Sequence, residues 1–156
     1  MNRIAVIRIA GEHGLTVDVK TTLKLLNLHR KYTCSIIPNQ PTSIGMLKKI
    51  KDYVTWGELD SKTFKNLLIH RGRLPGNKKL TEDYILETLK ISADEFVEKF
   101  MVKEKEIKEI PGLKPSFRLS PPVKGFERKG VKKPFSTGGV LGYRKEKINA
   151  LLERMI

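Results

Sequence analysis

The chain has 156 residues, and its 31 Lys and Arg outnumber its 17 Asp and Glu, so the formal charge is +14. This length fits one domain with an extension, and 39% hydrophobic residues suffice to bury a core. No apolar run approaches the roughly 18 residues of a membrane span, and a single cysteine excludes an internal disulfide. The first residues lack the features of a signal peptide, which predicts a cytoplasmic protein.

The first third of the chain alternates between strand and helix patterns. Residues 3–10 are short and β-branched and predict a strand, and residues 17–28 predict a helix with one apolar face. A second strand is expected over 32–37, a second helix over 43–52 and a third strand over 54–59. The order β-α-β-α-β places two helices over one face of a single sheet.

The middle third has a helical pattern. Helices are expected to begin at Ser61, Thr81 and Ser92, and Ser92 with Glu95 forms an S-x-x-E capping box. A basic turn over residues 71–79 separates the first two of these helices. The middle third therefore adds a helical extension to the β-α-β-α-β segment.

The segment between Lys114 and Phe135 has neither a helical nor a strand period. It is rich in proline and glycine, and it holds seven Lys and Arg against the single acid Glu127. Such a segment packs no core of its own, and its phenylalanines set it apart from a flexible linker. We expect it to become ordered against a partner. An amphipathic helix over 144–155 then returns to the core.

The excess positive charge lies at the two ends of the chain. Residues 1–52 carry a net charge of +6, residues 53–113 carry none, and residues 114–156 carry +8. Nucleic-acid phosphate is the commonest partner of so basic a small protein. Charge concentrated in this way is typical of a clamp on a polyanion.

The sequence shows no catalytic, metal-binding or cofactor-binding constellation. His13 adjoins Glu12 in a loop, but a general base needs a positioned pair and a pocket. Cys34 lies among apolar residues of a strand, which favours packing in the core over a role as a nucleophile. No phosphate-binding glycine loop or nucleophile elbow is present.

Phosphate binding is better supported, because basic residues gather on helix faces, at turns and along the tail. In the tail, phenylalanines alternate with cations, so rings can stack on unpaired bases while the cations bind the backbone. Packing on the protein's own core is the alternative for Phe117 and Phe135. The predicted RNA-binding residues are Lys20, Lys24, Arg30, Lys31, Lys48, Lys49, Arg71, Arg73, Lys78, Lys79, Lys114, Phe117, Arg118, Lys124, Phe126, Arg128, Lys129, Lys132, Lys133 and Arg144.

Several stretches together resemble one protein family, from residue 3 to the C-terminus. The chain resembles the archaeal form of the large-subunit ribosomal protein that is numbered thirty in bacteria and seven in eukaryotes. The bacterial form is similar only to about residues 1–59. The stretches that carry the resemblance are residues 8–11, 25–28, 46–47, 53–57, 71–72, 117–122 and 148–155.

The resemblance implies an α+β fold with a ferredoxin-like core over residues 1–60, whose three-stranded antiparallel sheet has the order 3-1-2. It implies a helical extension over 61–113, then a basic tail and C-terminal helix over 114–156 that packs back on the core. The implied role is structural: binding ribosomal RNA of the large subunit near the 5S RNA, beside neighbouring ribosomal proteins, and supporting assembly. No catalytic activity and no cofactor are implied.

Two other functions remain open from the sequence. A chromatin-like protein that coats DNA without sequence preference would also carry this charge, but it would not need phenylalanines in an irregular tail. An RNA-processing enzyme is a third reading, because ferredoxin-like folds host many activities. That reading requires a base or metal site, which the sequence does not display.

Overall fold

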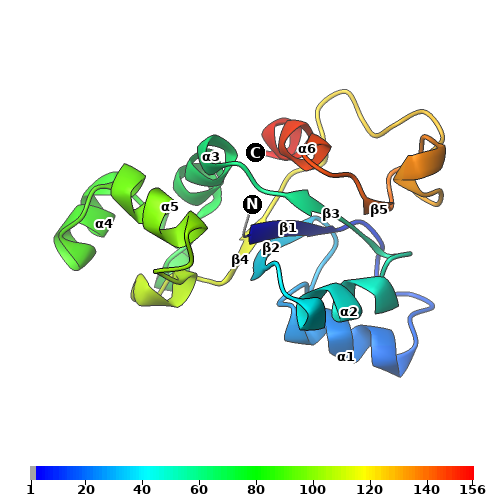
Figure 1. The fold of residues 1–156 in the computed structure, drawn as a ribbon, viewed down its shortest axis with the longest axis horizontal. Helices are drawn as coiled ribbons and strands as arrows, with labels where there is room; N and C mark the ends of the chain where they lie inside the picture. The colour runs from blue at the N-terminus through cyan, green and yellow to red at the C-terminus, as the bar shows by residue number, and fades with distance from the viewer. Residues whose placement is uncertain (1–2) are drawn as a thin grey trace.

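A mixed five-stranded sheet runs through the molecule, with helices on both of its faces (Figure 1). The structure is a computed structural model that describes residues 3–156. The strand order is β4-β2-β1-β3-β5; only the pairing of β3 with β5 is parallel. The strands are β1 (Arg3–Arg8), β2 (Thr33–Pro38), β3 (Val54–Glu58), β4 (Ser116–Arg118) and β5 (Gly142–Tyr143).

One face of the sheet packs against the two helices that the β-α-β-α-β pattern predicted. These are α1 (Val17–Leu25) and α2 (Pro41–Lys49), which lie below the sheet in Figure 1. Alternation along β1 sends Ile4 and Val6 into this layer, where they join Leu23 and Leu47 in one apolar cluster. The predicted order of the first five elements is therefore confirmed.

The other face of the sheet is covered as well, by the C-terminal helix that was expected to return to the core and by a helix whose place was not predicted. Ala5 and Ile7 point away from α1 and α2 and join a second apolar cluster. This cluster is covered by α3 (Ser61–Arg71) and α6 (Lys147–Met155), which lie above the sheet in Figure 1. All six residues of β1 are consequently buried, as expected for a strand that is covered on both faces.

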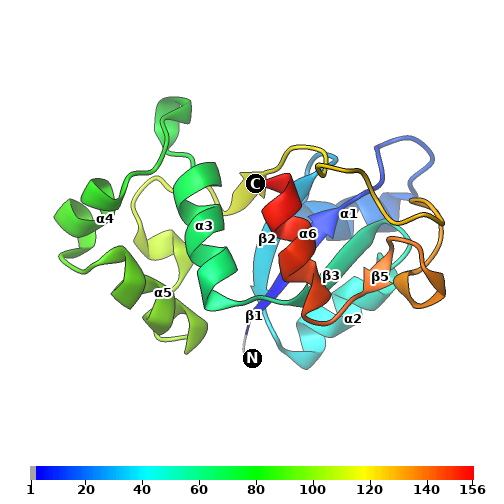
Figure 2. The same cartoon turned by 90° about the horizontal axis from the view of Figure 1, so that it is seen from above.

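Two shorter helices, α4 (Glu82–Leu89) and α5 (Ala93–Met101), pack beside α3 at one end of the molecule (Figures 1 and 2). The Phe64 and Phe100 rings stack with centroids 4.4 Å apart and hold α5 against α3. Arg3 connects this end to the sheet: its Nε donates to the carbonyl oxygen of Phe100 at 3.0 Å, and its guanidinium lies over the Phe100 ring.

The helix starts follow the predicted caps in α4 and α5 but not in α2. Thr81 Oγ1 accepts a hydrogen bond from the Tyr84 amide, and Ser92 Oγ accepts one from the Glu95 amide. The second helix was expected over residues 43–52 but begins at Pro41, because proline at the first helical position has no amide hydrogen to leave unpaired. None of the helices within residues 3–156 is long and apolar enough to cross a membrane.

The expected three-stranded antiparallel sheet is wrong in one respect: the tail adds a strand to each of its edges. β4 pairs with β2 in the register Cys34 to Phe117, although no strand was predicted between Lys114 and Phe135. β5 pairs with β3 in the register Trp56 to Tyr143. The inner three strands still have the order 3-1-2 that the resemblance implied, with residues 3–8 between residues 54–58 and residues 33–38.

Candidate nucleic-acid interface

Most of the predicted RNA-binding cations are exposed and form no ion pair with another residue of 3–156. Within residues 3–156, the ion pairs join Lys65, Lys105, Arg144 and Arg154 to acids, and none of the exposed predicted cations takes part. Their charge is therefore available to a polyanion. The exposed members of the set are Lys20, Lys24, Arg30, Lys31, Lys48, Lys49, Lys78, Lys79, Lys114, Arg118, Lys124, Arg128, Lys129, Lys132 and Lys133.

The buried guanidinium of Arg8 shapes the junction between α1 and β2. Arg8 Nη1 donates to the carbonyl oxygens of Leu28 and His29 at 2.8 and 2.9 Å, and Nη2 donates to that of Gly11 at 2.9 Å. Burial lowers the pKa of Arg8 from its ordinary value, and nearby Glu12 opposes that shift. Arg8 thus joins two loops into one rigid turn, from which the following Arg30 projects.

The tail meets this junction through aromatic contacts. Phe126 lies with its ring centroid 6.1 Å from that of Tyr32, and Lys31 Nζ lies 4.8 Å from the Tyr32 ring. Phe126 is half-buried by this packing. This contact places the part of the tail around Phe126 beside the junction, although the two lie far apart in the sequence.

Two open pockets mark further basic sites. Lys20 and Lys24, one turn apart on α1, line a cavity of about 340 Å³ together with Glu12 and His29. Lys132 of the tail and Lys51 of the α2–β3 turn line another, of about 190 Å³. The α2–β3 turn follows directly on Lys48 and Lys49, so it links the basic end of α2 to the tail.

Three of the residues that were predicted to contact RNA instead make contacts within the protein. Phe117 is fully buried in β4, so it packs on the core and is not available to stack on a base. Arg71 is half-buried: its Nη2 donates to Ser120 Oγ at 2.7 Å and its Nε donates to the main-chain oxygen of Ile156 at 3.1 Å. The third is Arg144, which is almost completely buried. Arg73 is half-buried and its carbonyl oxygen accepts from the Lys114 amide.

Arg144 is the centre of a polar cluster that ties the tail to the sheet. Its Nε donates to Thr55 Oγ1 at 2.9 Å, Nη2 donates to the Val140 carbonyl at 2.9 Å, and Nη1 pairs with Glu127 Oε1 at 2.8 Å. The guanidinium also lies 4.6 Å from the Phe135 ring centroid. Sequence alone placed Arg144 among the RNA contacts because its burial depends on the missed pairing of β5 with β3.

Two opposing influences, burial and the contacts with arginines, act on the pKa of Glu127 in this cluster. Burial alone raises the pKa of its carboxyl group, but hydrogen bonds from Arg144 and from its own backbone amide, together with the charges of Arg144 and Arg154, outweigh burial. The net result is a pKa below the ordinary value of glutamate. Glu127, the single acid of the basic tail, is therefore ionised at neutral pH and serves the fold.

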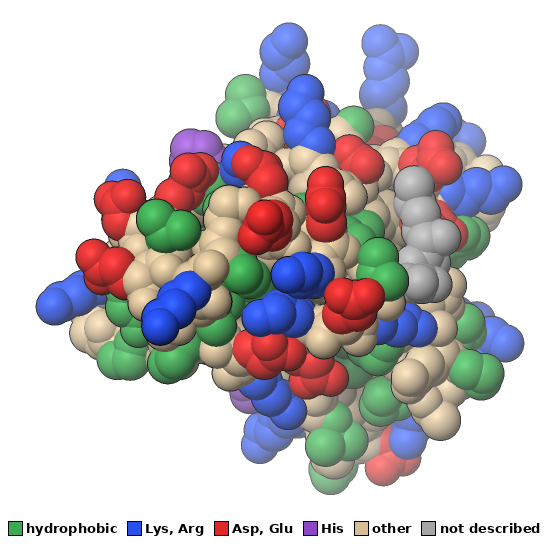
Figure 3. Space-filling model, turned by 60° about the vertical axis from the view of Figure 1, so that its left-hand side comes forward, with side chains coloured by type: hydrophobic (Ala, Val, Ile, Leu, Met, Phe, Trp, Pro, Cys, Tyr) green, Lys and Arg blue, Asp and Glu red, His purple; other side chains and the backbone are tan. Residues whose placement is uncertain are grey.

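The α4–α5 end of the molecule has the opposite character. Exposed acids lie on both helices, among them Glu82, Glu87, Asp94 and Glu98. Figure 3 turns this side forward and shows acidic side chains among basic and hydrophobic ones. Lys65 pairs with Asp94 at 2.6 Å, so cations in this region are partly neutralised by local acids. This face does not suit a polyanion.

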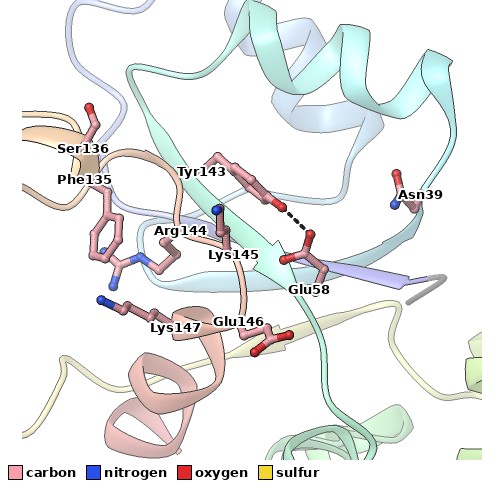
Figure 4. Close-up of a pocket in the computed structure, with 9 residues that line it drawn as sticks. All are labelled: Asn39, Glu58, Phe135, Ser136, Tyr143, Arg144, Lys145, Glu146 and Lys147. Atoms are coloured by element: carbon pink, nitrogen blue, oxygen red, sulfur yellow. Dashed lines mark hydrogen bonds between the residues drawn. The ribbon is translucent and has the colours of Figure 1, made fainter.

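The structure also shows exposed lysines that lie outside the predicted RNA-binding set. Lys51, Lys145 and Lys147 are exposed, and the last two line an open pocket beside β5 (Figure 4). The local charge of the tail indicated Lys145 and Lys147. Without the β3–β5 pairing, however, nothing indicated that these two residues share a pocket. No group of three or more potential metal-ligating side chains occurs within residues 3–156.

Comparison with known proteins places these features in a family. The model of the family described as ribosomal protein L30p/L7e matches residues 4–54. The chain is 50% identical over 152 residues to the large ribosomal subunit protein uL30 of Methanococcus maripaludis, covering 97% of this chain and 98% of that protein. It is 47% identical over 147 residues to the uL30 of Methanopyrus kandleri, covering 94% and 99%. It is also 47% identical over 152 residues to that of Nanoarchaeum equitans, covering 97% of each chain.

Proposed function

The chain belongs to the family of the large ribosomal subunit protein uL30, and on that premise we propose that it is a structural constituent of the large subunit that binds ribosomal RNA. The observation that carries the proposal is the set of exposed cations without internal partners, concentrated at the two ends of the chain. Phosphate groups are the natural counter-charge for such a surface.

The three segments have different parts in this proposal. Residues 1–60 present the cations of α1, of the α1–β2 junction and of α2, and residues 114–156 present those of the tail. Residues 61–113 support the sheet and contribute Arg73, Lys78 and Lys79, whereas the exposed acids of α4 and α5 contribute no contact. Contact with neighbouring ribosomal proteins and a position near the 5S RNA complete the proposal. Function in the subunit is scaffolding of RNA during and after assembly, with no catalytic step.

The RNA-facing set is narrower than the sequence alone predicted. We retain the exposed lysines and arginines and the half-buried Phe126 and Arg73. We remove Phe117, Arg71 and Arg144, because their side chains are engaged within the protein. In their place we add Lys51, Lys145 and Lys147, which are exposed and adjoin the retained residues.

The first experiment is sedimentation of the tagged protein with ribosomal particles through gradients at moderate and high salt. We expect stoichiometric migration with the large subunit, persisting through a moderate salt wash. For the isolated protein on large-subunit RNA, neutralising about 6–10 phosphates should reduce affinity about 10³- to 10⁵-fold between 50 and 200 mM salt. Binding that does not respond to salt, or equal affinity for plain duplex DNA, would contradict the proposal and favour the DNA-coating alternative.

Charge reversal tests the junction itself. Arg30→Glu with Lys31→Glu should weaken RNA binding strongly while the melting temperature stays unchanged, because both side chains are exposed. The matched control is Lys90→Glu with Lys103→Glu, which makes the same change of charge at exposed positions that follow α4 and α5. If the two double variants lose affinity equally, the effect comes from net charge alone and the junction is not a contact.

A further inference from the structure

The open pocket beside β5 that Lys145 and Lys147 line has further features that point to a ligand. It has a volume of about 920 Å³ and opens to the surface. Figure 4 shows its walls: Tyr143 on β5, Glu58 at the end of β3, Asn39 before α2, and Phe135 with Lys147 opposite. Its volume lies within the range of about 300–1,000 Å³ that is usual for small-ligand sites. Sequence segments from β2 to α6 meet here.

The cavity contains an aromatic ring that is fixed in place and partly open. Tyr143 is 47% exposed, which makes it the one exposed aromatic side chain of residues 3–156. Its hydroxyl donates a hydrogen bond to Glu58 Oε1, and its ring centroid lies 6.4 Å from that of Trp56. The hydrogen bond to Glu58 and partial burial raise the pKa of Tyr143 to about 12. The ring is therefore held at one end and stays neutral at physiological pH.

The charges around this ring are polarised. Lys147 and Lys145 are exposed on one side, and Lys147 Nζ lies 5.8 Å from the Phe135 centroid. Glu58 lies on the other side, and its Oε2 is buried without a hydrogen-bond donor. Glu58 therefore anchors the ring from inside the protein, since Oε1 accepts from Tyr143 and Oε2 is buried, while Glu146 is a second acid of the lining. The cavity thus combines an open aromatic face suited to a base with two exposed lysines that attract phosphate.

We propose that this cavity binds one unpaired nucleotide of RNA, with the base stacked on Tyr143 and the phosphate between Lys145 and Lys147. The inference rests on the proposed function and names a subsite within it. An unpaired base offers a flat face on which the Tyr143 ring can stack. A ring that is already fixed loses little conformational entropy when a base stacks on it. Paired bases within a duplex would not enter the cavity.

The single tryptophan of the chain provides the assay, because it is the neighbour of Tyr143. Octa-adenylate is titrated into the full-length protein at 50 mM salt while Trp56 fluorescence is recorded. A base stacked on Tyr143 should quench that fluorescence. Inorganic polyphosphate of similar charge serves as the probe without bases, and we expect it to bind with little quenching. Equal quenching by polyphosphate would overturn the proposal, because the cavity would then recognise only anions.

Substitutions of Tyr143 separate stacking from structure. Tyr143→Ala should raise the octa-adenylate concentration at half-saturation about 5- to 150-fold, the range expected for loss of one stacked base. Tyr143→Phe keeps the ring and should stay within about threefold of the unaltered protein. Tyr84→Ala is the control, because Tyr84 is also hydrogen-bonded but lies on α4. Thermal melts confirm that each variant is folded before titration.

The outcomes separate this inference from the proposed function. If Tyr143→Ala changes octa-adenylate affinity less than twofold, or if Tyr143→Phe loses as much as Tyr143→Ala, the nucleotide subsite is wrong. Large-subunit RNA binding by the unaltered protein, with its steep salt dependence, would remain in either case. If the unaltered protein fails to bind that RNA, the proposed function itself fails. The slope of affinity against salt should be unchanged in Tyr143→Ala and shallower in Lys145→Ala.

Discussion

Glu127→Ala would leave the guanidinium of Arg144 buried without its carboxylate. The Arg144 side chain is only 1% exposed, and its Nη1 and Nη2 face the two Glu127 oxygens at 2.8 and 3.4 Å. After the substitution, the hydrogen bonds to Thr55 and Val140 would remain, but the charge would have no counter-ion. The β5 strand and the tail loop that carries Glu127 would lose the ion pair that joins them.

The expected loss of unfolding free energy in Glu127→Ala follows from the burial of the Arg144–Glu127 ion pair. Breaking a buried ion pair by removing one partner costs about 3–5 kcal/mol. Glu127 is 25% exposed, so water can approach the vacated site and the lower end of the range applies, about 3 kcal/mol. For a chain of this size, that loss corresponds to a melting temperature lower by roughly 6–12 °C.

The assay is urea unfolding of the full chain at pH 7, followed by circular dichroism. Glu153→Ala is the control, because Glu153 is exposed on α6 and makes no ion pair within the described residues. Its unfolding free energy should change by less than about 0.5 kcal/mol. A change that small for Glu127→Ala would refute the argument, since it would mean that Arg144 is solvated or paired elsewhere.

The same pair predicts a pH dependence. Because the folded state lowers the pKa of Glu127, its contribution is fully present above the ordinary glutamate value of about 4.3. That contribution is lost as the pH falls from there through the lowered pKa. The difference in unfolding free energy between the unaltered protein and Glu127→Ala should therefore shrink in acid. A difference that grows between pH 5 and pH 3 would contradict the assigned direction.

Two substitutions and one chemical modification test the packing of the sheet. Phe117→Ala should destabilise the protein by about 3–5 kcal/mol in urea unfolding, because the side chain is fully buried, and a surface role would predict no loss. Gly57→Ala should cost about 1–3 kcal/mol or more, because the new Cβ would lie 2.0 Å from the Lys145 carbonyl oxygen; an unchanged melting temperature would contradict that contact. Burial raises the pKa of the Cys34 thiol to about 12, so a thiol reagent at pH 8 should modify it only after denaturation.

The strands and helices of the first third could be predicted because each has a strong local pattern. β1 carries the β-branched Ile4, Val6 and Ile7, and α1 carries Val19 and Leu23 one turn apart on its buried face. β4 and β5 could not be predicted in the same way. They contain three and two residues, too few for a period to be visible, and their pairing depends on backbone hydrogen bonds to distant strands.

The same limit explains which candidate site residues were correctly placed. Exposed lysines such as Lys24 and Lys129 follow from local charge, which a sequence displays directly. The burial of Arg144 depends on Thr55 and Glu127, and Thr55 lies 89 residues away in the chain. Tyr143 was missed for a similar reason, because its ring is positioned by Glu58, 85 residues away. Long-range partners of this kind leave no periodic signal.

The late completion of the sheet has a consequence for synthesis of the chain. β3 ends at Glu58, whose tyrosine partner on β5 emerges 85 residues later, and Phe117 of β4 also emerges long after Cys34. At roughly 5–20 residues per second, translation from Glu58 to Tyr143 takes about 4–17 seconds. During that interval the nascent chain presents two unpaired strand edges and an apolar face without its last covering helix. We therefore expect the nascent protein to be a client of ribosome-associated chaperones, and full-length synthesis to be the point at which it becomes resistant to proteases.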